Sequence, residues 1–226
     1  MLAADSRGKT RLATKLITGL YFRLARRRMI HGVKVGVFLP EWPAEVLFTK
    51  IRAALDLIRQ FDASQLARMH QLVSGILVIG NVGPLGAWHQ DNRLIKLRED
   101  HVGKTDTHPI HIAATLIHET THAWLHQRGY KYSPVYRRRM EAVCYRRERN
   151  FARRVPGCEE LADYYESRAR RVLAQSDDDW SDAAFQEFNI GYIRQSGVLP
   201  DWLMRLIESR GPAGKRSDEA GPEESN

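Results

Sequence analysis

The chain has few cysteines and no long apolar run, and these two features limit the class of protein to which it can belong. It holds only two cysteines in 226 residues, Cys144 and Cys158, which are too few for a disulfide framework. It also lacks any stretch of about 20 uninterrupted apolar residues, so we expect no membrane-spanning helix. No internal repeat is visible. We therefore expect a cytoplasmic protein with reduced thiols.

The remaining composition is that of one globular domain with irregular ends. Hydrophobic residues make up 43% of the chain and charged residues 27%, which is ordinary for a soluble protein. We expect a basic N-terminal arm and a first strand over residues 1–40, and the globular domain over residues 41–210. Residues 211–226 are rich in Gly, Pro, Ser and charge, and they are predicted to form a disordered tail.

Positive charge is concentrated near the N-terminus. Residues 1–40 hold nine Lys/Arg and one acid, Asp5, so their net charge equals the +8 of the whole chain. The apolar run at 16–22 is short, contains Gly19 and lacks a small-residue cleavage site, which makes a signal peptide a poor fit. A solvated arm is predicted, with contact to anionic lipid or nucleic acid as the weaker alternative.

The pentapeptide His118-Glu119-Thr120-Thr121-His122 is the most informative feature of the sequence. Residues four apart lie on one face of a helix, so two imidazoles at this spacing can bind one Zn²⁺. Glu119 lies between them and is predicted to be the general base for a zinc-bound water. The alternative is a histidine pair that only packs against other residues or caps the helix.

A buried helix is predicted around this motif. Residues 107–109, Thr-His-Pro, are typical of a helix start, and Gly129 is typical of a helix end. Apolar residues recur between them at helical spacing, which indicates a helix through the centre of the domain. A second helix is predicted from Val135 to Arg154, before the Val-Pro-Gly at 155–157.

The sequence also predicts further helices and strands that carry fewer candidate functional residues. A hairpin is expected from two strands, 86–90 and 93–97, joined by a two-residue turn at Asp91-Asn92. Its first strand, with Trp88 and His89, would either pair with an extended peptide in a cleft or only cover the central helix. The further predictions are helices at 44–61, 65–73, 159–173, 180–193 and 200–209, and a strand at 75–80.

The third metal ligand can be narrowed by exclusion, because catalytic zinc usually takes three protein ligands. None of the nine histidines lies beyond His126, and Arg128 occupies the position that a metzincin ligand would need. A peptide-deformylase-like site needs an upstream cysteine, whereas both cysteines follow the motif. A downstream carboxylate or a neighbouring histidine remains.

Glu141 is the preferred carboxylate. On the predicted second helix it shares a face with Cys144, Tyr145 and Glu148, while arginines dominate elsewhere on that helix. An acid on the apolar side of a helix needs a partner, and a metal would supply one. A salt bridge between Glu141 and an arginine is the alternative. The other candidate ligands are Glu148 first, and then Glu159, Glu160 and Asp163.

Several residues could complete a site around the metal. His111 and His126 lie on the same side of the central helix as the motif histidines, and His126 either lines a cleft or is the exposed end of the helix. Tyr136 and Tyr145 are candidates for a donor to the oxyanion of an acyl-transfer reaction.

Together these residues resemble the minimal gluzincin metallopeptidases, with the ImmA/IrrE-type bacterial proteases as the nearest named relatives. The resemblance rests on HETTH, a Gly-x-Lys-Tyr turn at 129–132 and Glu-Ala-Val-Cys at 141–144, and it covers roughly residues 75–157. It implies a mostly helical α+β, zincin-like fold, in which a small sheet packs on the HExxH helix. It also implies His118, His122 and Glu141 as zinc ligands. Tyr145 departs from the larger gluzincins, in which an acid at this position often supports a ligand histidine.

The function expected from the sequence is zinc-dependent hydrolysis of peptide bonds, with a peptide or protein as the substrate. In that reading Glu119 takes a proton from the attacking water and passes it to the leaving amine. The alternative function is a zinc-stabilised binding or regulatory protein that does not turn over a substrate. The presence of Glu119 argues against this alternative, since a structural zinc site needs no base.

Overall fold

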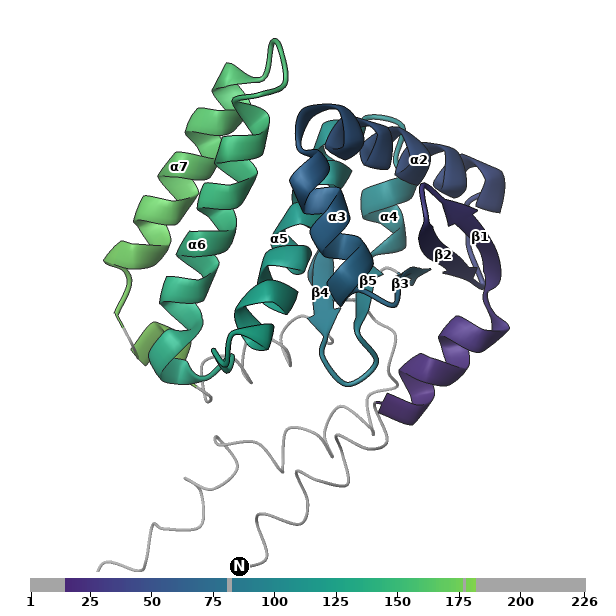
Figure 1. Ribbon diagram of the computed structural model, residues 1–226, viewed down its shortest axis with the longest axis horizontal. Helices are drawn as coiled ribbons and strands as arrows, with labels where there is room; N and C mark the ends of the chain where they lie inside the picture. The colour runs from purple at the N-terminus through teal and green to yellow at the C-terminus, as the bar shows by residue number, and fades with distance from the viewer. Residues whose placement is uncertain (1–14, 81–82, 177, 182–226) are drawn as a thin grey trace, which may run out of the picture.

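The chain folds into a mixed sheet with most of its helices on one face (Figure 1). The computed structural model describes residues 15–80, 83–176 and 178–181. The predicted α+β, mostly helical class is confirmed. Within the described residues no helix is both long and apolar enough to cross a bilayer.

The sheet has five strands in the order β1-β2-β3-β5-β4. The inner strands β2, β3 and β5 run parallel, whereas β1 and β4 are antiparallel edge strands. The strands are β1 (Arg26–Ile30), β2 (Val33–Phe38), β3 (Gly75–Ile79), β4 (Gly86–His89) and β5 (Leu94–Leu97).

The helices follow the sequence patterns closely, and residues 15–24 are helical as well. The labelled helices are α2 (Ala44–Phe61), α3 (Ala63–Leu72), α4 (Glu99–Gly103), α5 (Pro109–Gln127), α6 (Pro134–Ala152), α7 (Glu159–Ala174) and the 3-10 turn η1 (Asp178–Trp180). The predicted helices at 44–61, 65–73, 135–154 and 159–173 are confirmed to within two residues at each end. Helix α5 starts at Pro109 and ends before Gly129, as predicted. The short helix α4 was not predicted.

The main core lies between one face of the sheet and helices α2, α3 and α5. Alternate strand residues such as Val35, Ile76 and Ile95 point to this face, as the two-residue period of a strand requires. The other face is partly covered by the helix at residues 15–24, whose Phe22 lies against the backbone of Gly36. The residues of α5 that face the sheet are part of the main core.

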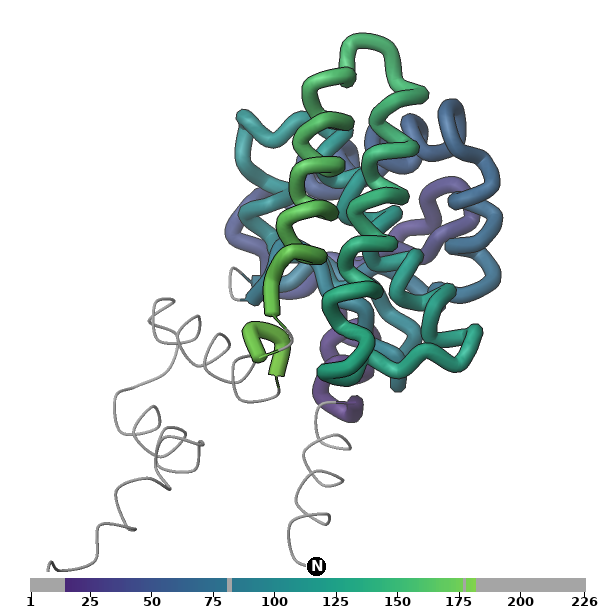
Figure 2. The backbone as a smooth tube through the Cα atoms, turned by 90° about the vertical axis from the view of Figure 1, so that its left-hand side faces the viewer, coloured from purple at the N-terminus to yellow at the C-terminus, as the bar shows by residue number. Residues whose placement is uncertain are grey.

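Helices α6 and α7 form an antiparallel pair beside α5, on the side away from the sheet (Figures 1 and 2). Pro134 and Pro109 each occupy the first turn of their helix, where a missing N–H does no harm. The α5–α6 connection places one face of α6 directly against the motif on α5.

The structure differs from the sequence prediction at two turns. Residues 26–38 form a hairpin with His31 and Gly32 at positive φ, 46° and 77°, as a two-residue primed turn requires. The basic segment at 26–28 thus belongs to the sheet. The loop between β4 and β5 has four residues rather than two, because Arg93 adopts a φ of 52° and ends the ladder at His89 and Leu94. The predicted helix at 200–209 and the tail lie outside the described residues, as does most of the predicted helix at 180–193.

Candidate metal centre

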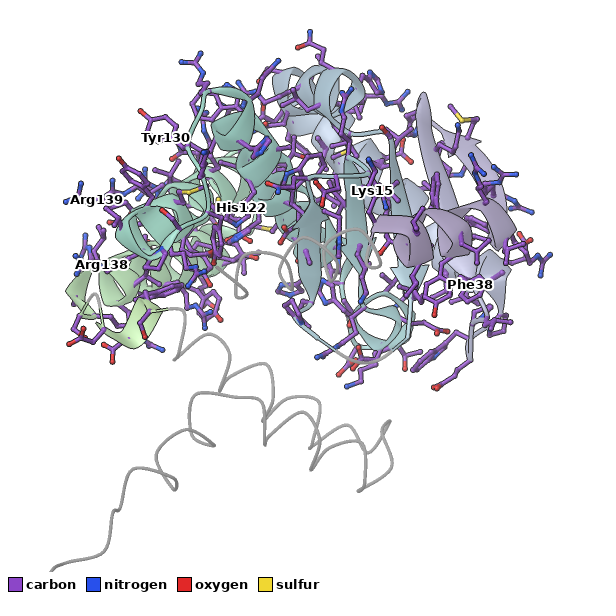
Figure 3. The ribbon with its side chains drawn as sticks, turned by 90° about the horizontal axis from the view of Figure 1, so that it is seen from below. Lys15, Phe38, His122, Tyr130, Arg138 and Arg139 are labelled. Atoms are coloured by element: carbon purple, nitrogen blue, oxygen red, sulfur yellow. The ribbon has the colours of Figure 1, made fainter. Side chains whose placement is uncertain are left out.

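The two motif histidines and Glu141 converge at the contact between α5 and α6. The Nε2 atom of His118 lies 3.1 Å from one carboxylate oxygen of Glu141, and Nε2 of His122 lies 3.2 Å from the other. All three side chains are largely buried, with exposed fractions of 11–12%. Figure 3 shows His122 between α6 and the sheet when the molecule is seen from below.

Glu141 is held in place by a residue of the loop before α6. The Tyr132 hydroxyl donates a hydrogen bond of 2.8 Å to Glu141 Oε1, and its ring lies edge-on to that of His122 at 5.4 Å. Burial raises the pKa of Tyr132, so the phenol stays a donor. A fixed carboxylate that faces two imidazole nitrogens is suited to share a cation with them.

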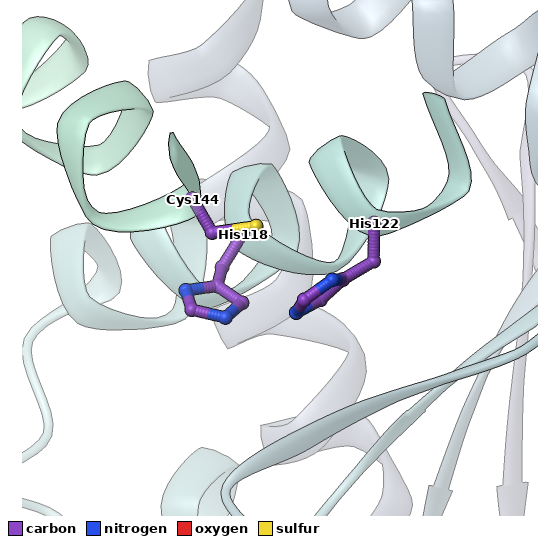
Figure 4. Close-up of side chains that lie close together, drawn as sticks. All are labelled: His118, His122 and Cys144. Carbon is purple, nitrogen blue, oxygen red and sulfur yellow. The ribbon is translucent and has the colours of Figure 1, made fainter. Parts of the chain in front are cut away.

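A second donor set uses the same histidines and Cys144. One ligand atom each from His118, His122 and Cys144 lies within 4.8 Å of the others, and the sulfur projects from α6 beside the two rings (Figure 4). Cys144 is fully buried and forms no disulfide. Glu141 presents its two oxygens to the two Nε2 atoms at 3.1 and 3.2 Å, and the Cys144 thiol is a hydrogen-bond partner of His122, so both residues are candidates for the third donor.

Glu148 lies behind His118 and not at its Nε2 side. Its Oε2 atom is 3.4 Å from His118 Nδ1, and it makes no well-aligned hydrogen bond within the described residues. The prediction of Glu148 as an alternative ligand is therefore not supported by its position. An acid at the second nitrogen of a ligand histidine orients the ring and raises its basicity. Glu148 is therefore placed where it could orient His118 if that residue binds a metal.

The groups around the two histidines favour their protonated forms. Burial alone would lower the pKa of both histidines. Cys144, Glu148 and Glu141 instead raise the pKa of His118 well above the ordinary value, and Cys144 and Glu141 do the same for His122. Burial likewise opposes the ionisation of Glu141, yet the two imidazoles hold its pKa well below the usual range. A bound divalent cation would replace the protons on the histidines.

Glu119 lies beside this cluster without joining it. The residue is only 6% exposed, and burial raises the pKa of its carboxyl while His118 and His122 oppose that shift. A backbone hydrogen bond links Glu119 to Trp88 on β4. A buried carboxylate with a raised pKa is a better proton acceptor than an exposed one.

Strand β4 approaches Glu119 closely because Gly86 has no side chain. A Cβ at this position would lie 2.5 Å from Thr115 Cγ2 and 3.1 Å from Glu119 Oε1. The glycine therefore lets the edge strand lie directly against the face of α5 that carries Thr115 and Glu119. Within the described residues β4 is the last strand of the sheet, so its edge opposite β5 pairs with no other strand.

These groups line a cleft of about 1160 Å³ between β4, α5, α6 and α7. On the α7 side, Arg168 donates a 2.7 Å hydrogen bond to the Tyr145 hydroxyl, and the Tyr145 ring lies edge-on to His118 at 5.2 Å. A cleft of this size beside an edge strand can hold an extended peptide.

The other predicted site residues fall into two groups, those that line the cleft and those that do not. His111, His126, Trp88 and Tyr145 line the cleft, and His126 is also exposed near the end of α5. The residues that line it do not include Tyr136, which lies edge-on to Tyr130 at 6.2 Å. The same holds for His89, Glu159, Glu160 and Asp163.

Three residues of the site were missed or undervalued in the sequence. Cys144 shares the Glu141 face of α6, so its spacing was a usable signal. Tyr132 lies in the Gly-x-Lys-Tyr turn but carried no role of its own. Arg168 comes from α7, which no local pattern connects to the motif.

Comparisons of this chain with protein-family models, with curated proteins and with solved structures found no match.

Proposed function

We propose that this protein is a zinc-dependent peptidase of the gluzincin type, as its resemblance to the ImmA/IrrE-like proteases implies. The observation that carries the proposal is the position of Glu119. Its buried carboxylate lies next to two imidazoles that converge on Glu141, at the wall of an open cleft. A purely structural metal site needs neither the base nor the cleft.

The residues present fit zinc. Two imidazole nitrogens and one carboxylate oxygen form a donor set typical of catalytic zinc, which keeps a further position for water or substrate. His118, His122 and Glu141 would hold the ion. When bound, zinc would polarise the scissile carbonyl and lower the pKa of water at the site.

The protein's own residues would then position and move protons. Glu119 would take a proton from the attacking water and deliver it to the leaving amine. The outer edge of β4, where the Trp88 backbone N–H bonds Glu119, would hold the substrate backbone in an extended form, as edge strands do in β-augmentation. The hydroxyl of Tyr145 accepts from Arg168, so its own proton is free to be donated toward the oxygen of the scissile carbonyl.

The substitution Glu119→Gln tests the function directly. It keeps the size and polarity of the side chain and removes the proton acceptor, so zinc content should be unchanged. The rate of hydrolysis should fall by about 10²–10⁴-fold or more. Zinc is measured by metal analysis and activity with a diverse peptide library. Glu160→Gln, on the exposed side of α7, is the matched control.

A second function is favoured by one observation, the position of Cys144. If the sulfur joins His118, His122 and Glu141, four protein ligands would close the site, as in structural zinc centres. The protein would then be a zinc-stabilised binding protein. Replacing zinc with cobalt(II) distinguishes the peptidase from the binding protein. A thiolate ligand to cobalt gives an intense charge-transfer band, which Cys144→Ser would abolish. The peptidase proposal expects no such band. A cobalt protein that shows it, and no cleavage by the wild type, would favour the binding protein.

A further inference from the structure

The helix at residues 15–24 exposes a continuous apolar stripe. Leu16, Leu20 and Leu24 recur every four residues, which places them on one helix face. They are 63%, 52% and 65% exposed, and the adjacent Ile17 is 48% exposed. Four large aliphatic side chains side by side form a contiguous apolar patch. Such a patch indicates an interaction site, unlike single exposed apolar residues.

The opposite side of this helix is fixed to the sheet, so the leucines cannot turn inward. Phe22 fills the space above Gly36 and Gly75, where an added Cβ would lie 3.1 Å and 2.4 Å from its ring. At the other end, the Asn92 side chain donates a 2.9 Å hydrogen bond to the Lys15 carbonyl. Figure 3 shows the helix lying across the strands, with Lys15 labelled.

Exposed cations flank the apolar stripe. Lys15 and Arg23 belong to the helix itself, and both are exposed. Arg27 on β1 pairs with Gly36 on β2, so it lies on the sheet face that the helix covers. Lys34 pairs with Met29, which is 60% exposed on the same face.

We propose that this surface binds an anionic lipid bilayer. We call it the N-terminal face, and it consists of Leu16, Ile17, Leu20, Leu24, Lys15, Arg23, Arg27 and Lys34. An amphipathic helix of this kind lies in the interfacial plane, with its aliphatic side chains in the acyl boundary and its cations at the headgroups. The helix carries out this role while it stays packed on the sheet through Phe22.

Charge and apolar surface together select the bilayer over a nucleic acid. Both partners would attract the cations, but a phosphate backbone offers nothing to three exposed leucines. Binding of single strands relies on stacking aromatics, and here Phe22 is turned toward the sheet, while Tyr21 stacks on Phe38 at 4.7 Å. The face and the cleft also share the β4–β5 hairpin, whose loop contacts Lys15 and whose first strand carries Trp88.

The test is co-sedimentation of the full chain with vesicles of phosphatidylcholine alone or with about 30% phosphatidylserine, at low and at physiological salt. We expect retention on the anionic vesicles that weakens as salt rises. The double substitution Arg23→Gln/Arg27→Gln should lower the partition coefficient about 25-fold at low salt, at about fivefold per cation. Leu16→Gln/Leu20→Gln, which keeps helix-forming residues, should lower it by at least about tenfold.

Matched controls lie elsewhere on the surface. Val135→Gln/Leu173→Gln removes two exposed aliphatic side chains from α6 and α7, and Arg52→Gln/Arg171→Gln removes two exposed cations. Both controls should bind as the wild type does.

Equal retention on neutral and anionic vesicles would overturn the proposal. So would leucine variants that bind normally but melt at a lower temperature, because another part of the chain or a second copy would then cover the stripe. Salt-sensitive retention on duplex DNA without vesicle binding would point to a nucleic acid instead.

Discussion

At the scale of single residues, Glu148 could support the proposed metal site without being a ligand. Its carboxylate lies 3.4 Å from His118 Nδ1, on the far side of the ring from Glu141. In other metal sites, mutating a partner of this kind typically lowers metal affinity by about 10–100-fold. We therefore expect Glu148→Gln to lower zinc affinity by about 10–100-fold, whereas Glu141→Gln should lower it more, since a charged ligand is lost.

Competition with a chromogenic chelator measures both affinities, and Glu160→Gln again serves as the surface control. If Glu148→Gln binds zinc like the wild type, the carboxylate does not support His118. If Glu148→Gln loses more affinity than Glu141→Gln, the ligand assignment on α6 must be reversed.

His101 gives a pH-dependent prediction at the same scale. Burial, together with Arg98 and His111, lowers the pKa of His101 to about 4, while its Nε2 lies 3.0 Å from the Thr115 hydroxyl. The unfolded chain binds a proton more readily between pH 6.5 and 4, so the stabilisation is present above pH 6.5 and is lost as pH falls. The free energy of unfolding should drop by about 2 kcal/mol between about pH 7.5 and 5 from this residue.

Urea unfolding of the wild type and of His101→Gln, at both pH values, isolates this contribution as the difference between their pH dependences. His70→Gln, on the exposed side of α3, is the matched control. Identical pH dependences for the wild type and His101→Gln would show that His101 is not held neutral by the fold.

At the scale of elements, the contact between β4 and α5 depends on Gly86. A Cβ there would meet Thr115 Cγ2 at 2.5 Å. Overpacking of this kind costs about 1–3 kcal/mol, which exceeds the roughly 0.4–1 kcal/mol that a Gly→Ala change can gain through the unfolded state. Gly86→Ala should therefore lower the free energy of unfolding and slow peptide hydrolysis.

Thr115→Ser provides the matching rescue, because it removes the methyl group and keeps the hydroxyl that contacts His101. The double variant should regain most of the lost stability while activity stays reduced, since the Cβ would still lie 3.1 Å from Glu119. Full stability and activity in Gly86→Ala alone would mean that β4 can move away from the helix without consequence.

At the scale of the whole molecule, the metal would connect α5 in the core to the α6–α7 pair beside it. A ligand that binds only the folded state stabilises it by about 2.7 kcal/mol at 100 times its dissociation constant. For a domain of this size that corresponds to about 5–11 °C in Tm. A chelator should therefore lower the Tm of the wild type by this amount, as differential scanning fluorimetry can show, and leave His118→Ala unchanged. A chelator effect of equal size in both proteins would place the stabilising metal elsewhere.

The sequence by itself determined the central helix, its motif and the helix that follows. Apolar residues at helical spacing, prolines at helix starts and Gly129 at a helix end are local signals, so α2, α5, α6 and α7 could be bounded from them. The spacing of His118, Glu119 and His122 is likewise a property of one helix and needs no tertiary information.

Only the tertiary structure decided which side chains surround the motif. Glu148 and Cys144 share a helix face with Glu141, but the rotation of α6 against α5 determines which of them faces Nε2 and which faces Nδ1 of His118. Arg168 reaches the cleft from another helix. The strand at 26–30 was hidden because its arginines obscure the alternating pattern of a half-buried strand. These contacts join residues far apart in the chain, and a sequence pattern reports only on neighbours within a few turns.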